Sequence, residues 1–254
     1  MTTTPHRFDA DTELRPAGGL SWTAGVGDGW VSLSGVPNGG YLMSLALRAA
    51  TCALPGIEPI TATAHFLRPG LVGPARLDVE VVKRGRTTST AGVALVQGGK
   101  ERVRTLVTLG GPDGGPPDFA PSAPPLPRPR GCAPSGPEVV GSASVRRRFD
   151  YRLVPTGGAG VRGWVRFADG RDPDLAAVPL VVDCFPPAVL GVLDGVRMST
   201  LELTVHLRRP PRPGWLQAGI RSRALLHGLV EEEVELWDED GGLVAMSRQL
   251  AQLG

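Results

Sequence analysis

The chain has 254 residues, of which 41% are hydrophobic and 20% are charged, so it is globular and long enough to bury a sizeable core. A formal net charge of +2 and an aromatic content of 5% argue against a nucleic-acid-binding protein. The three cysteines form no CxxC pair and no apolar run reaches about 18 residues, so we expect neither a zinc site nor a membrane span. Because the first residues lack a secretory signal pattern, we expect a cytoplasmic protein.

The first half of the chain predicts a helix followed by a run of strands. Two short strand patterns, at 20–26 and 29–35, precede an apolar segment over 39–54, whose hydrophobic residues recur at helical spacing. Asn38 is placed to cap this helix. Alternating, β-branched segments that end in turn residues then predict four strands, at 60–67, 75–83, 87–97 and 101–110.

A segment rich in proline divides the chain. Residues 110–137 hold ten of the 25 prolines, a density that neither a helix nor a sheet interior tolerates. We therefore predict a linker, partly in the polyproline II conformation. This gives an N-terminal unit over 1–110, a linker over 111–143 and a C-terminal unit over 144–254.

The second half repeats the first at an offset of 141 residues. A strand at 161–168 and an apolar, helix-like segment at 176–194 precede four strand patterns, at 201–209, 215–226, 229–240 and 241–253. At this offset His65 falls on His206, and a His-x-x-Arg-Pro pattern is shared. Gene duplication explains this best, and it predicts an α+β fold of two tandem units. Each unit wraps an antiparallel sheet around a central helix, and the two units pair their exposed edges into one sheet.

One carboxylate interrupts the second apolar segment, "LVVDCFPPAVLGVL". Asp183 is costly to bury unless it is paired or used, and the corresponding helix of the first half has no acidic residue. Two explanations are open: Asp183 caps a helix or forms a salt bridge, or it belongs to a site. In the first half, Gly39 and Gly40 follow Asn38 and leave open backbone N–H groups at a helix start. Asn38, Gly39 and Gly40 are therefore candidates for substrate binding, and a simple helix start with tight packing is the alternative.

The motifs "GGYLMSLALRAA", "HFLRPG", "VVDCFPPAVL" and "STLELTVHLRRP" occur in an order that resembles the bacterial thioesterase II-like acyl-CoA thioesterases. The resemblance covers nearly the whole chain except the linker. It implies a double hotdog fold, no cofactor, an acyl-CoA substrate, a role in lipid metabolism and a homo-oligomer. It also implies that Asp183, Thr200 and Gln249 hold the water that attacks the thioester.

Some residues depart from the pattern of this family or admit other readings. Leu250 and Ala251 follow Gln249 where many members have Glu-Gly, and Pro186 and Pro187 stand side by side in the helix-like segment. The acidic run 231–233 is interpreted as a solvated strand face or as protection of a sheet edge. A non-catalytic acyl-CoA or lipid-binding protein and a hydratase-like hotdog enzyme stay open as alternatives, whereas the absence of a G-x-S-x-G motif argues against a serine hydrolase.

Overall fold

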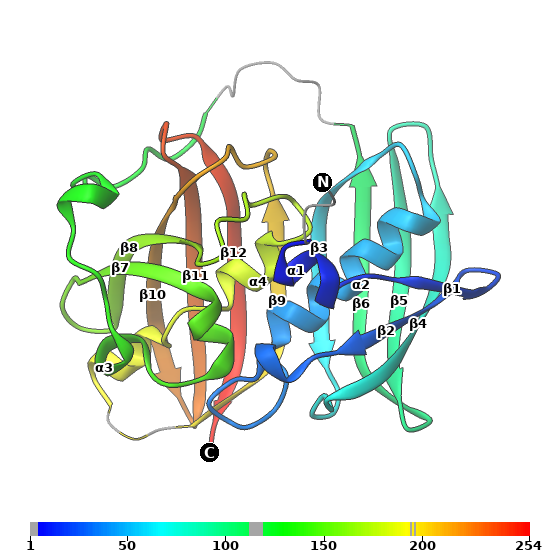
Figure 1. Cartoon of the computed structure of the whole chain (residues 1–254), viewed down its shortest axis with the longest axis horizontal. Coiled ribbons are helices and arrows are strands. Elements are labelled where there is room, and N and C mark those ends of the chain that lie inside the picture. The colour runs from blue at the N-terminus through cyan, green and yellow to red at the C-terminus, as the bar shows by residue number, and fades with distance from the viewer. Residues whose placement is uncertain (1–4, 112–118, 194, 196) are drawn as a thin grey trace.

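One antiparallel sheet of twelve strands runs through the whole molecule (Figure 1). The computed structural model describes residues 5–111, 119–193, 195 and 197–254. The strands of the first half are β1 (Arg15–Gly18), β2 (Ser21–Val26), β3 (Glu58–Phe66), β4 (Gly73–Arg84), β5 (Thr88–Gln97) and β6 (Lys100–Gly110). Those of the second half are β7 (Phe149–Pro155), β8 (Gly160–Phe167), β9 (Met198–Leu207), β10 (Leu216–Leu226), β11 (Leu229–Asp238) and β12 (Leu243–Leu253).

The strand order shows the predicted duplication directly. Across the sheet it reads β1-β2-β4-β5-β6-β3 and then, mirrored, β9-β12-β11-β10-β8-β7. Strands β5 and β11 are separated by the offset of 141 at both ends. The halves meet where β3 pairs with β9, and there Thr63 lies opposite Thr204, its counterpart at this offset, with 2.9 Å between the two hydroxyl oxygens. An approximate two-fold axis therefore passes through this threonine pair.

Each half of the sheet curves around a helix. Helix α2 (Gly39–Ala53) crosses the first half, and the short α4 (Val178–Val182) lies in front of the second (Figure 1). Most of α2 and all of α4 are buried, as expected for helices that are apolar on every side. Two further short helices are α1 (Arg7–Asp11) and α3 (Pro137–Val140). This is the predicted α+β double hotdog.

Two predicted elements differ from the structure, and two strands were not predicted. The pattern at 29–35 forms no strand, because a 3-10 turn occupies Asp28–Trp30 and only an isolated bridge joins Val31 to Pro37. The two strands that were not predicted are β1 and β7, at the two edges of the sheet. The helix expected over 176–194 ends at Val182, because Pro186 and Pro187 cannot continue it, and a 3-10 turn follows at Ala188–Gly191.

Residues 121–127 of the linker lie against the outer face of the second half-sheet. Three of their backbone carbonyls, spaced three residues apart as in a polyproline II helix, accept hydrogen bonds from side chains of β8, β10 and β11. These three donors stand opposite one another on neighbouring strands. The pairs are Pro121 with Trp237 (3.2 Å), Pro124 with Gln217 (2.5 Å) and Pro127 with Trp164 (2.9 Å).

Candidate active site

Asp183 joins the two halves of the molecule. It ends α4, and its Oδ2 accepts hydrogen bonds from the backbone N–H of Gly40 and from Nδ2 of Asn38, both at 2.8 Å. The carboxylate of the second unit thus lies at the N-terminus of the first unit's helix, where the helix dipole favours negative charge. Oδ1 accepts no hydrogen bond from the described part of the chain. One carboxylate oxygen is fixed, and the other is free to bind a ligand.

Asn38 and the two glycines after it support this contact. Asn38 caps α2 as predicted, because its Oδ1 accepts the N–H of Tyr41 at 3.0 Å, while its Nδ2 also donates to the backbone oxygen of Asp183. Gly40 was expected to offer an open N–H, but that group is bonded to Asp183. The N–H of Gly39 has no hydrogen-bond acceptor within the described residues, so Gly39 keeps the predicted open amide.

Thr200 and Gln249 also come together. The Thr200 hydroxyl donates to Oε1 of Gln249 at 3.0 Å, and Gln249 is buried although it lies near the end of the chain. A bulge in the β9–β12 ladder makes this possible, because Leu201 has no partner and Thr200 pairs with Ala251. Thr200 and Gln249 therefore point to the same face of the sheet. Within the described residues, neither of them forms a hydrogen bond with Asp183.

Glu232 lies next to Gln249 on the neighbouring strand. Its burial corrects the interpretation of residues 231–233 as a solvated strand face. Only 5% of Glu232 is exposed. Its Oε1 accepts Nε2 of Gln249, its direct partner across the β11–β12 ladder, at 2.9 Å. Its Oε2 accepts the N–H of Ala188 at 2.6 Å and the more distant hydroxyl of Ser222. We call Ser222, Glu232, Gln249 and Thr200, on β10, β11, β12 and β9, the polar row.

The sequence carries a signal for Glu232 that was missed. Along β11 the residues Val230, Glu232, Val234 and Leu236 alternate with more exposed positions, and all four are buried. Alternation places such residues on one face of the sheet. Since the apolar members of the series must face the core, Glu232 must face it with them.

Burial changes the acidity of both carboxyl groups. It raises the pKa of Asp183 to about 6, although the Gly40 and Asn38 hydrogen bonds oppose the change. It raises the pKa of Glu232 to about 7, and the charge of Asp183 contributes to this rise. The segment between Asp183 and Ala188 holds the two groups near each other. Arg146, which is itself buried, partly offsets their negative charge.

This acidity predicts how stability changes with pH. A carboxyl group whose pKa is raised on folding binds protons more tightly in the folded chain, so its contribution to stability is present below its unfolded pKa and is lost as pH rises through the folded one. For Glu232, rising from 4.5 to about 7, the loss is up to about 3 kcal/mol. Glu232→Gln should therefore gain stability relative to the natural chain between pH 5 and pH 8, as urea unfolding at both pH values will show. A difference that does not vary with pH would contradict this.

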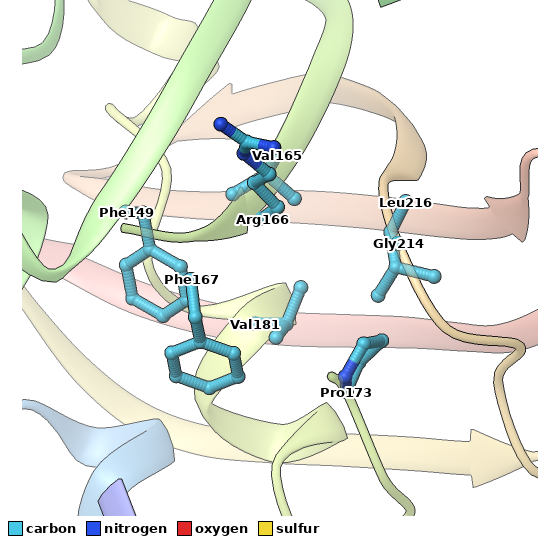
Figure 2. A pocket seen from close by; sticks show the side chains of 8 residues that line it. All are labelled: Phe149, Val165, Arg166, Phe167, Pro173, Val181, Gly214 and Leu216. Carbon is cyan, nitrogen blue, oxygen red and sulfur yellow. The ribbon is translucent and has the colours of Figure 1, made fainter. Parts of the chain in front are cut away.

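Two hollows lie elsewhere, one within the second unit and one between that unit and the linker. One lies beside α4, with Val181 among the aromatic and aliphatic side chains of β7, β8 and β10 (Figure 2), and it has no room for a water molecule. The other, of about 620 Å³, is lined mainly by the arginines 128, 130, 152 and 166 and by Trp215. Neither is lined by Asp183 or by a member of the polar row. The candidate site is defined by its hydrogen bonds and not by these hollows.

With this geometry in view, comparison with known proteins decides the family. Residues 27–110 match the family model of the acyl-CoA thioesterase N-terminal domain, and residues 113–253 match that of the C-terminal domain. The chain belongs to the acyl-CoA thioesterase family. It is a thioester hydrolase, and the part of the chain that the structure describes has no helix both long and apolar enough to cross a bilayer.

This thioesterase is also similar to individual proteins along nearly its whole length. A crystal structure from Thermobifida fusca, provisionally assigned as a thioesterase II, is 31% identical, with a TM-score of 0.90 over 98% of this chain and 97% of that one. A hot dog protein of unknown function from Alicyclobacillus acidocaldarius, 22% identical, shares the fold with a TM-score of 0.91 over 99% of both chains. An uncharacterized protein of Mycobacterium tuberculosis is 30% identical over 85% of each chain.

Proposed function

We propose that this thioesterase hydrolyses acyl-CoA with a water held between Asp183 and the Thr200–Gln249 pair. The observation that carries the proposal is that the two oxygens of the Asp183 carboxylate differ in their hydrogen bonding. Oδ2 is bound to Gly40 and Asn38, whereas Oδ1 accepts no hydrogen bond from the described residues. A carboxylate oriented in this way, with a pKa raised to about 6, is a competent general base near neutral pH.

The chemistry follows from these positions. The water oxygen forms a bond to the thioester carbonyl carbon, and Oδ1 of Asp183 takes a proton from that water. The Thr200 hydroxyl donates to Gln249, so its lone pairs can accept the other water hydrogen. The C–S bond then breaks, and the electron pair leaves with the CoA sulfur. Because an alkyl thiol has a pKa near 8.5, this thiolate leaves without a strong acid and later takes up the proton. The products are a carboxylic acid and CoA.

The open amide of Gly39 completes the proposal. Its N–H lies at the start of α2, and a side chain built there would come within 3.3 Å of Asp183 Oδ2. We propose that this N–H polarises the thioester carbonyl, which develops negative charge in the transition state. Asn38 and Gly40 then serve the substrate site indirectly, by holding Asp183.

Thiol release from a panel of acyl-CoA esters, from acetyl to C18 and aromatic chains, tests the reaction. We expect hydrolysis of at least one ester, and a loss of about 10²-fold in kcat for Thr200→Ala and for Gln249→Ala, because each removes one hydrogen bond that positions the water. Thr204→Ala, on the same strand but outside the polar row, is the matched control. Binding without thiol release would show a carrier, and hydration of an enoyl-CoA without thiol release would show a hydratase.

A further inference from the structure

Glu232 is a buried acid to which the proposed reaction gives no role. Its backbone lies in the middle of β11, and both carboxylate oxygens accept hydrogen bonds, from Gln249 on one side and from Ala188 and Ser222 on the other. In the first unit, Ala91 occupies the corresponding position on β5, and its partner across the ladder is Val107. Both are fully buried and apolar. The fold therefore does not require a carboxylate here.

The hydrogen-bonding capacity of each group fixes the direction of the whole row. An ionised carboxylate can only accept, so Gln249 must turn its Nε2 toward Glu232. Its Oε1 then faces Thr200, whose hydroxyl must donate to it. The oxygen of Thr200 is left with its lone pairs available to a water. If the side-chain amide of Gln249 were flipped, its Nε2 would donate a hydrogen bond to the Thr200 oxygen and occupy the lone pair that the water needs.

We propose that Glu232 is a positioning residue that sets the amide orientation of Gln249 and, through it, turns the Thr200 hydroxyl into an acceptor for the attacking water. This inference rests on the proposed function of the Asp183 site and goes beyond it. Glu232 touches neither water nor substrate and acts only through its neighbour in the row.

The charges around Glu232 make its orienting role depend on pH. The titratable groups that act on it are Asp183, at the end of α4, and Arg146, in the turn before β7; the other contacts come from Ser222, Gln249 and the Ala188 amide. A protonated Glu232 would carry an O–H that competes with its role as an acceptor. Since Asp183 must also be ionised to act as the base, two protons must leave before the site is competent.

The experiment combines Glu232→Gln with pH profiles of thioester hydrolysis. The variant keeps the size of the side chain but cannot accept from both Gln249 and Ala188. We expect kcat to fall about 10²-fold with KM changed less than threefold, because a small misplacement at the reacting centre has effects of this size. In the natural chain, log kcat/KM should fall with a slope of two below pH 6, and in Glu232→Gln with a slope of one.

Two controls separate positioning from structural damage. Glu233→Gln changes the next residue of β11, a partly exposed glutamate paired with Arg221, and should leave kcat unchanged. In a chain that already carries Gln249→Ala, Glu232→Gln should cause little further loss, because its effect passes through Gln249. Additive losses, or normal kcat in Glu232→Gln, would overturn the positioning role. If Asp183→Asn stayed active, the proposed base would fail instead, which is a different result.

Discussion

Asp183→Asn should reduce kcat for acyl-CoA hydrolysis by about 10³-fold, within the range that general base catalysis contributes. The amide oxygen of the asparagine can still accept from Gly40 and Asn38, as Oδ2 does now. Its NH₂ group, however, would replace Oδ1 and would donate where the water needs an acceptor. Thiol release under substrate saturation measures the effect.

The folding of this variant provides the necessary comparison. At neutral pH Asp183→Asn should unfold at the same temperature as the natural chain or above it, because it removes a charge whose burial is unfavourable. Asp150→Asn makes the same chemical change at a surface ion pair with Arg166 and should leave both activity and stability nearly unaltered. If Asp183→Asn hydrolysed substrate within a few-fold of the natural rate, Asp183 would not be the base.

Gly40→Ala should destabilise the fold by about 3 kcal/mol, at the upper end of the range for overpacking a core. A β-carbon at Gly40 would overlap the carbonyl oxygen of Pro179 and would lie 2.7 Å from Cβ of Asp183 and 2.9 Å from Cα of Leu180. Because two of these obstacles are backbone atoms of α4, the helices must separate. That shift would also break the Gly40–Asp183 hydrogen bond, so activity should fall as well.

Thermal unfolding of three glycine variants tests this reason. Gly40→Ala should melt about 10 °C lower than the natural chain. Gly39→Ala should have a smaller effect, because its β-carbon meets chiefly the ring of Phe66, a side chain that can move. Gly25→Ala, in β2, meets nothing within 4 Å and should be neutral or slightly stabilising. An equal loss at Gly25 and Gly40 would mean that helix contact is not the cause.

Periodicity in the sequence predicts most of the fold. Alternation located β3 to β6 and β8 to β12 within a few residues, and helical spacing located α2, because each of these elements has a face or a whole surface that must be buried. The approach fails where one proline pair or an edge position decides. Pro186 and Pro187 reduce the second helix to five residues. Strand β7 was missed although Phe149, Tyr151 and Leu153 alternate with Asp150 and Arg152, because it directly follows the linker and pairs on one side only.

The candidate site was predictable only in part. The family resemblance named Asp183, Thr200 and Gln249, but the sequence could not show that Asn38 and Gly40 of the other unit hold Asp183. Such contacts depend on how closely α2 and α4 approach. The bulge at Leu201, which orients Thr200, is likewise a property of strand pairing. The burial of Glu232 was overlooked because the residue stands between two other glutamates in the sequence. Only the alternation of β11 shows that it faces the core and they do not.

The approximate two-fold axis through Thr63 and Thr204 has a consequence for stoichiometry. Two identical units related by such an axis would form two equivalent sites, each made from both units. Here the two sites are not equivalent. The first unit has Ala91 and Val107 at the positions where the second unit has Glu232 and Gln249. Covalent joining lets the two copies diverge in this way, because neither can exchange its partner. Each chain should therefore turn over one thioester at a time and titrate with a single active-site equivalent.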